Sequence, residues 1–212
     1  LVVITLIIAT PVGVGAAIYL TEYAKQGRLT RIIEFTTETL AGIPSIIYGL
    51  FGMIFFVVFL KWDYSLMAGA ATAAIMVLPT ILSTTKEALD AVPDSYREGS
   101  FALGTGKLRT IFKVVLPAAV PGILSGIILA IGRIVGETAA LLYTSGTATR
   151  GLTKGLMSSG RTLAVHMYTI SSEGFHTKQT FATAVILLIF VFIINTLSSV
   201  AAKQISKKAG GQ

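Results

Sequence analysis

Five stretches of this 212-residue sequence, each 19 to 24 residues long, contain no Asp, Glu, Lys or Arg. A helix needs about 20 consecutive apolar residues to cross the hydrocarbon core of a bilayer. We therefore predict an all-α, multi-pass transmembrane helical bundle with five spans. The predicted spans are Leu1–Thr21, Thr39–Leu60, Tyr64–Thr85, Val114–Gly132 and Gln179–Ala202.

The composition excludes several classes of protein. Hydrophobic residues make up 53% of the chain and charged residues 13%, whereas an ordinary soluble domain carries about 25% charged residues. A soluble enzyme, a secreted disulfide scaffold and a disordered tail are therefore excluded. The chain has no cysteine, which also excludes thiolate chemistry and metal sites with Cys ligands.

The distribution of cations predicts how the chain is oriented in its membrane. Short cytoplasmic loops are enriched in Lys and Arg. If the segment after the first span is cytoplasmic, that side carries eleven cations and the opposite side five. The C-terminus is then cytoplasmic and Leu1 lies outside, and we expect one more helix before Leu1. The cytoplasmic set is Lys25, Arg28, Arg31, Lys86, Arg97, Lys107, Arg109, Lys113, Lys203, Lys207 and Lys208, and the outer set is Lys61, Arg150, Lys154, Arg161 and Lys178.

The net charge of +7 therefore reflects topology and attraction to anionic lipid in the bilayer. No basic run alternates with aromatic residues as in nucleic-acid grooves, so we expect no nucleic-acid partner.

We expect one transmembrane domain over residues 1–212, with a cytoplasmic loop at 86–113 and an extracytoplasmic loop at 144–178. Several glycines argue against one continuous helix in the extracytoplasmic loop.

The segment 86–113 carries signals for a short surface helix. Pro93 suits a first helical turn, Asp94 and Glu98 place negative charge near the helix N-terminus, and Gly104 suits the C-terminal stop. This helix has apolar side chains to bury, among them Tyr96. It either docks on a cytoplasmic protein partner or lies as an amphipathic stretch on lipid headgroups.

The same segment resembles the EAA loop of ABC-importer permeases. That pattern is Glu-Ala-Ala, three residues, Gly, nine residues, Ile, one residue, Leu-Pro; here it is Glu98-Gly99-Ser100, then Gly104, Val114 and Leu116-Pro117 at the same spacing. The resemblance implies a coupling helix that docks on an ATP-binding subunit. Its residues would be Tyr96, Glu98, Gly99, Ser100, Gly104 and Pro117. Gly99 departs from the pattern and costs about 1 kcal/mol of helix propensity against Ala.

Two opposite charges interrupt the fourth apolar region. The i, i+4 spacing of Arg133 and Glu137 predicts that both side chains lie on one helical face. Charged residues inside a membrane normally face a bundle interior or a water-filled path. Arg133 would then compensate an anionic solute in transit, with Glu137 holding Arg133 or repelling the anion. The alternative is an ion pair that only ties helices together.

Three segments make the resemblance more specific. Residues 132–142 (Gly-Arg-Ile-Val-Gly-Glu-Thr-Ala-Ala-Leu-Leu), 16–24 and 42–52 resemble the PstA-type permeases of phosphate ABC importers. The family pattern usually has Pro where this chain has Ala140. The resemblance implies a PstC-type homologous permease, ATP-binding subunits and an extracytoplasmic phosphate-binding protein as partners. It also implies that the protein is a multi-pass integral protein of a bacterial or archaeal cytoplasmic membrane. ATP hydrolysis would occur in a separate subunit, so the chain itself would be neither an enzyme nor the holder of a cofactor.

Other functions remain as alternatives. An ABC importer for another oxyanion, such as sulfate or molybdate, would share the EAA loop. An ion-coupled secondary transporter would need no ATPase, and it leaves the long cytoplasmic insertion unexplained. His166 and His176 do not form a compact metal-binding spacing, so we expect no metal site.

Overall fold

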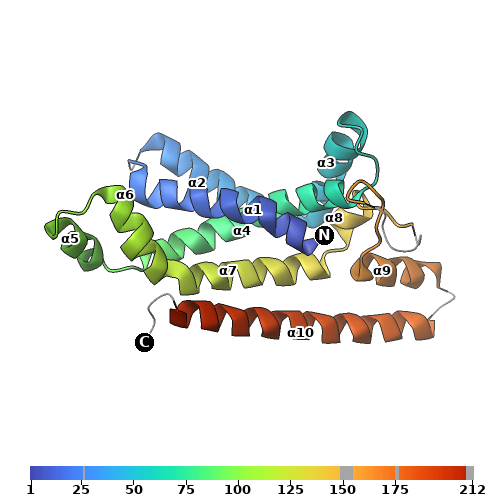
Figure 1. Ribbon diagram of the computed structural model, residues 1–212. Helices are drawn as coiled ribbons and strands as arrows, with labels where there is room; N and C mark the ends of the chain where they lie inside the picture. Colours follow the sequence, from blue (N-terminus) through green and yellow to red (C-terminus); the bar gives the residue numbers. More distant parts are fainter. Residues whose placement is uncertain (26, 149–154, 175–176, 209–212) are drawn as a thin grey trace.

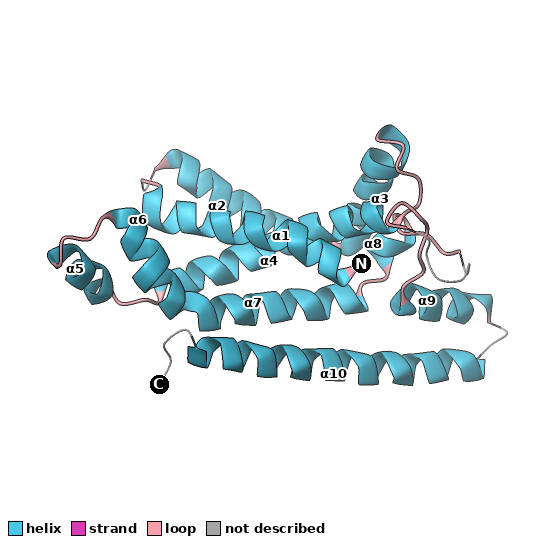
Figure 2. Ribbon diagram, viewed as in Figure 1, coloured by secondary structure: helices cyan, strands magenta, loops and turns pink. Residues whose placement is uncertain are grey.

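The computed structural model describes residues 1–25, 27–148, 155–174 and 177–208, with side chains of the last helix described through residue 205. Every regular element in these residues is helical (Figure 2). The all-α prediction is therefore confirmed. The elements are α1 (Val2–Ile18), the π-helical turn η1 (Tyr19–Tyr23), α2 (Arg28–Ala41), α3 (Ser45–Gly52), η2 (Met53–Phe59), α4 (Leu66–Asp90), α5 (Asp94–Ala102), α6 (Lys107–Thr110), η3 (Ile111–Val115), α7 (Leu116–Gly136), α8 (Ala139–Leu142), α9 (Leu163–Glu173) and α10 (Thr177–Lys208).

Four of the five predicted spans are long apolar helices. In the described part of the chain they are Val2–Tyr23, Leu66–Asp90, Lys107–Gly136 and Thr177–Ile205. Each is at least 22 residues long, which is enough to cross a bilayer. The chain is therefore an integral membrane protein.

The remaining predicted span, Thr39–Leu60, is wrong as a single helix. The chain bends by 100° between α2 and the α3–η2 segment. Pro44 causes the break, because a proline disfavours helical backbone in the preceding residue and provides no N–H of its own. The Leu40 carbonyl at the end of α2 accepts from the Tyr48 hydroxyl at 2.6 Å and from the Ile43 N–H at 3.1 Å, so Tyr48 ties α3 to the end of α2. Counted as one broken span, the pair brings the total to five.

Small residues allow the long helices α1, α4 and α7 to pack closely. A Cβ at Gly13 of α1 would lie 2.8 Å from a methyl carbon of Ile81 in α4. One turn further along α4, a Cβ at Gly126 of α7 would lie 2.7 Å from the Cβ of Thr84. In a membrane the hydrophobic effect does not drive helices together, because lipid tails are as apolar as the side chains. Close approach of the backbones therefore stabilises helix association through van der Waals contacts.

The packing sets the depth of each residue along the bundle. Gly122 faces Ala88 and Gly126 faces Thr84, so α7 runs antiparallel to α4. If this pairing is continued along both helices, Arg133 lies beside the stretch from Val77 to Thr80, which is the middle of α4.

The two ends of the bundle differ (Figure 1). One end, called here the α5 end, holds α5, α6, the start of α2 and the end of α10; the α9 end holds α3, α8, α9 and the start of α10. α10 packs mainly on α7 and α9, and the rest of its surface is open to lipid in this chain.

Candidate functional site

Arg133 lies in the last turn of α7 and borders a groove between α4, α7 and α10. The groove has a volume of about 640 Å³. Its lining combines apolar side chains with neutral polar ones: Thr80, Ser125, Ile128, Leu129, Gly132, Arg133 and Asn195. Among the described residues of this lining, Arg133 is the one that carries a charge.

The Arg133 guanidinium has no counter-ion in the described residues. The salt bridges and hydrogen bonds of the described chain do not include it. A charge at the centre of a membrane helix costs several kcal/mol by insertion scales. An unpaired, half-buried cation at mid-depth is therefore a position where an anion would be stabilised.

Glu137 does not share a helical face with Arg133, contrary to the expectation from spacing. α7 ends at Gly136, and Glu137 has an extended backbone with φ −70° and ψ 127°. Its carboxylate is buried and accepts a hydrogen bond from the Ala140 N–H at 3.0 Å. A proline at position 140, as in the family pattern, could not donate this bond. Glu137 thus satisfies the first turn of α8 rather than holding Arg133.

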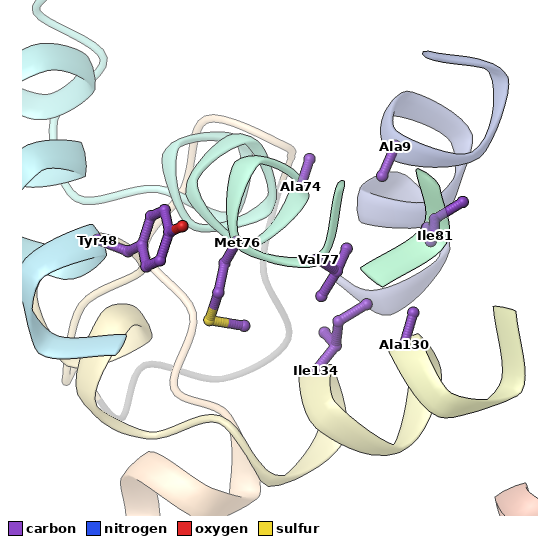
Figure 3. Packing of buried hydrophobic residues seen from close by; sticks show 8 residues of the cluster. All are labelled: Ala9, Tyr48, Ala74, Met76, Val77, Ile81, Ala130 and Ile134. Carbon is purple, nitrogen blue, oxygen red and sulfur yellow. The ribbon is translucent and has the colours of Figure 1, made fainter. Parts of the chain in front are cut away.

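Two broken helices meet near Arg133. α3 follows the break after α2, α8 follows the break after α7, and Gly49 of α3 lies directly against Ala140 of α8. Tyr48 and Ile134 pack in the buried cluster beside them, together with Ala9 of α1 (Figure 3). Helix breaks inside a membrane are tolerated only where protein or a water-filled cavity surrounds the freed backbone, so this junction is a candidate transport site.

The predicted surface helix exists as α5, and its C-terminal stop is confirmed. Gly104 has φ +77°, a left-handed conformation that favours glycine. The Thr105 N–H donates to the Ser100 carbonyl and the Gly104 N–H to the Phe101 carbonyl. These two bonds form a Schellman motif. Pro93 is the N-cap residue rather than part of the first turn.

Ser100, one of the departures from the EAA pattern, joins α5 to α6. Its hydroxyl lies 2.5 Å from that of Thr105 and 2.9 Å from that of Thr110. Ser100 and Thr110 are both buried, so the three hydroxyls satisfy one another away from water. Gly99, the other departure, faces open space.

The other predicted coupling residues lie on two different elements. Tyr96 and Glu98 are exposed on α5, and the nearby Leu103 is 85% exposed. Pro117 lies in the first turn of α7, directly after η3. The exposed side chains on and directly after α5 therefore include Tyr96, Glu98 and Leu103, while Pro117 lies in the span that follows the loop.

Two polar features were missed at the sequence level. Arg97, counted there only as a loop cation, forms a largely buried ion pair with Glu22, with side chains 16% and 8% exposed. Asn195 of α10 borders the Arg133 groove, and its buried Oδ1 has no hydrogen-bond partner among the described residues. A signal existed for Asn195, because it is an amide inside an apolar stretch of 24 residues.

The segment 144–178 contains α9 between irregular stretches. Arg161 donates to the Thr147 carbonyl at 2.7 Å, and its Nη1 lies 2.9 Å from His166 Nδ1. Within the described residues, no three His, Asp or Glu side chains are placed to hold a metal ion. His176 and the cations Arg150 and Lys154 lie outside the described residues.

Comparison with known proteins identifies relatives over most of the chain. The chain is 39% identical over 197 residues to the phosphate transport system permease protein PstA of Yersinia pestis, covering 92% of this chain and 66% of that protein. It is 43% identical over 140 residues to PstA 1 of Mycobacterium tuberculosis (66% of this chain, 46% of that protein). YqgI of Bacillus subtilis, a probable ABC transporter permease, is 36% identical over 183 residues (81% and 62%). The resemblance to PstA-type permeases is thus confirmed, and the chain spans about half to two thirds of the length of these relatives.

Solved structures and a family model agree on the architecture. A chain of the MetNI methionine ABC transporter, in inward-facing conformations, superposes with a TM-score of 0.74 at 22% identity, covering 99% of this chain and 89% of that one. A bacterial ABC transporter that imports the acidic polysaccharide alginate gives a TM-score of 0.67 at 11% identity (96% and 75%). The family model of the binding-protein-dependent transport system inner membrane component matches residues 9–210. The chain therefore belongs to the family of binding-protein-dependent transport system inner membrane components.

Proposed function

We propose that this chain is the transmembrane subunit of an ATP-driven phosphate importer, forms half of the translocation path and couples to a separate ATPase. The observation that carries the phosphate assignment is Arg133, an unpaired guanidinium at mid-depth beside a groove. Arginine suits this role because its planar fork matches the oxygens of phosphate and remains charged at any working pH. The similarity to PstA proteins supports the same solute.

The coupling role rests on α5. Its exposed apolar side chains, Tyr96, Phe101 and Leu103, need a protein groove to cover them, and Glu98 adds a charge on the same helix. We propose that an ATP-binding subunit supplies this groove, with Gly104 and Ser100 fixing the shape of the turn behind α5. Pro117 contributes indirectly, at the start of the span that α5 would move.

The complete transporter would contain several partners. We propose a PstC-type permease beside this chain, two ATP-binding subunits at the α5 end and a phosphate-binding protein at the α9 end. The α5 end then faces the cytoplasm together with the C-terminus of α10. Described cations gather at that end, including Lys25, Arg28, Lys107 and Lys113, as expected for cytoplasmic loops. Catalysis would belong to the ATPase subunits, and we propose no cofactor for this chain.

Uptake of labelled phosphate tests the proposal. In cells carrying the full-length protein, we expect Arg133→Gln to reduce uptake by about 10- to 150-fold, because a hydrogen bond to a charged group contributes about 1.5–3 kcal/mol. Membrane level and co-purification of the ATP-binding subunit should remain at wild-type values. Arg31→Gln is the matched control, since Arg31 is an exposed cation of α2 outside the groove.

The same cells separate the alternatives. If Arg133→Gln imports phosphate normally, Arg133 is not in the path and the assignment fails. If the wild type imports labelled sulfate or molybdate in preference to phosphate, the chain serves another oxyanion. If no ATP-binding subunit co-purifies with the wild-type protein, an ion-coupled secondary transporter becomes the better explanation.

A further inference from the structure

Arg97 of α5 is the centre of a partly buried polar contact at the α5 end. Its Nε and Nη2 donate to the same oxygen of Glu22, at 3.1 and 2.9 Å. Nη2 also donates to the Leu89 carbonyl at 3.0 Å, and Nη1 to the Val92 carbonyl at 2.8 Å. Nη1 donates in addition to the exposed Asp94 carboxylate at 3.2 Å. One side chain therefore connects α5, η1 and the C-terminal end of α4.

Burial makes this ion pair different from a surface pair. The side chains of Arg97 and Glu22 are 16% and 8% exposed. Removing one partner from a buried pair leaves an uncompensated charge and is strongly unfavourable, so the pair resists separation. The other inter-helix pair of the described chain, Lys86–Glu34 between α4 and α2, is 31% and 36% exposed and does not contact α5.

η1 receives a second contact from the same loop. The Lys107 ammonium of α6 lies 4.9 Å from the centre of the Tyr23 ring, within the range of a cation–π interaction. Both helices of the loop thus attach to the end of the first span. Elsewhere, α5 packs on α6 and η3 of its own loop, so Arg97 provides its charged connection to the rest of the bundle.

The first span leads from this contact to the Arg133 region. η1 continues α1 without interruption, and α1 packs along α4 through Gly13 and Ala17. At mid-depth, Ala9 of α1 joins the buried cluster that includes Ile134, the residue after Arg133 (Figure 3). A closely packed helix transmits displacement along its length, because protein interiors have low compressibility.

We propose that the Arg97–Glu22 pair is the link through which movement of α5 is transmitted to α1 and from there to the helix junction around Arg133. Arg97 and Glu22 are positioning residues, since neither would contact the solute. The inference rests on the proposed function insofar as α5 is the ATPase-coupling helix. It adds a named route from that helix to the transport site.

The first test uses the full-length protein assembled with its permease and ATPase partners in membranes. Glu22→Gln keeps the size of the side chain and an acceptor oxygen but removes the charge. We expect ATP hydrolysis and subunit association to persist, while labelled phosphate transported per ATP hydrolysed falls by about 5- to 150-fold, the usual range for coupling between sites. Glu34→Gln is the matched control and should keep the wild-type ratio.

A wild-type ratio in Glu22→Gln would overturn the proposal. If Glu22→Gln does not assemble, a second measurement decides. The chain has no cysteine, so spin labels can be placed at Ser95→Cys in α5 and Tyr19→Cys in η1, both exposed positions, with the ion pair intact. We expect the distance between the labels to be the same in the nucleotide-free and ATP-trapped transporter.

A change in that distance would show that α5 moves independently of η1 and would overturn the link. The distance measurement does not depend on the solute. If the wild type fails to import phosphate, the proposed function fails, while the label distance still decides whether α5 and η1 move together.

Discussion

Glu137 maintains the break between α7 and α8 with one hydrogen bond to the Ala140 N–H. We expect Glu137→Gln to retain the fold, because the amide oxygen can still accept that bond. Glu137→Leu leaves a buried N–H unpaired, at a cost of about 1–3 kcal/mol. The melting temperature of the purified full-length protein in detergent should therefore fall for Glu137→Leu and change little for Glu137→Gln. Equal melting temperatures for the two variants would contradict this role.

At the residue scale, the type of a residue was easier to predict than its geometry. Arg133 was identifiable because it interrupts an apolar region. The relation of Arg133 to Glu137 was predicted wrongly, because the i, i+4 rule assumes that the helix continues through Gly136. Glycine has a low helix propensity, and Glu137 stabilises the next helical turn instead. Arg97 and Glu22 are 75 residues apart in the chain, so no local pattern could pair them.

At the scale of elements, α4 and α7 pack closely because α7 has glycines where the two helices meet. A Cβ at Gly126 would lie 2.7 Å from Thr84 Cβ, whereas a Cβ at Gly15 of α1 would have no neighbour within 4 Å. We expect Gly126→Ala to destabilise the protein by about 1–3 kcal/mol through overpacking. At roughly 2–4 °C per kcal/mol, thermal unfolding of the purified protein would detect this loss.

Gly15→Ala is the matched control for this prediction. It makes the same substitution in a membrane helix and gains helix propensity without a steric overlap. Its melting temperature should equal or exceed that of the wild type. If Gly126→Ala is as stable as Gly15→Ala, close contact between α4 and α7 does not determine the stability of the bundle.

Hydropathy predicted four of the helices correctly because each of them is apolar over a length that can cross the membrane. It did not predict the bend between α2 and α3, because charge-free composition is the same in a straight and a broken span. Pro44 was the available signal. Proline alone does not decide the matter, since Pro11 and Pro79 lie inside the continuous helices α1 and α4.

At the scale of the whole molecule, the orientation can be tested with single cysteines. Lys203→Cys lies in the last part of α10, and Ser172→Cys lies in α9 at the opposite end; both positions are exposed. In intact cells, we expect a membrane-impermeant thiol reagent to label Ser172→Cys and not Lys203→Cys. Inside-out vesicles should give the reverse. The protein without either substitution is the background control, since residues 1–212 contain no cysteine. Labelling of Lys203→Cys in intact cells would contradict the proposed orientation.

The architecture of the whole molecule followed from two sequence signals of different kinds. The apolar stretches predicted a helical bundle, and the resemblance on residues 98–117 and 132–142 predicted the permease type. The site required the structure, because Arg133 and Asn195 come together only through the packing of α7 and α10. A single sequence contains the composition of these helices but not their register.

The peripheral position of α10 has a consequence for biosynthesis. α1, α4 and α7 form the packed centre of the chain, and α10 is added to its outside by contacts with α7 and α9. α7 ends at Gly136 and α10 begins at Thr177, so the ribosome makes α10 roughly 2–8 s later at about 5–20 residues per second. The three central helices can therefore associate in the bilayer before the last one is synthesised.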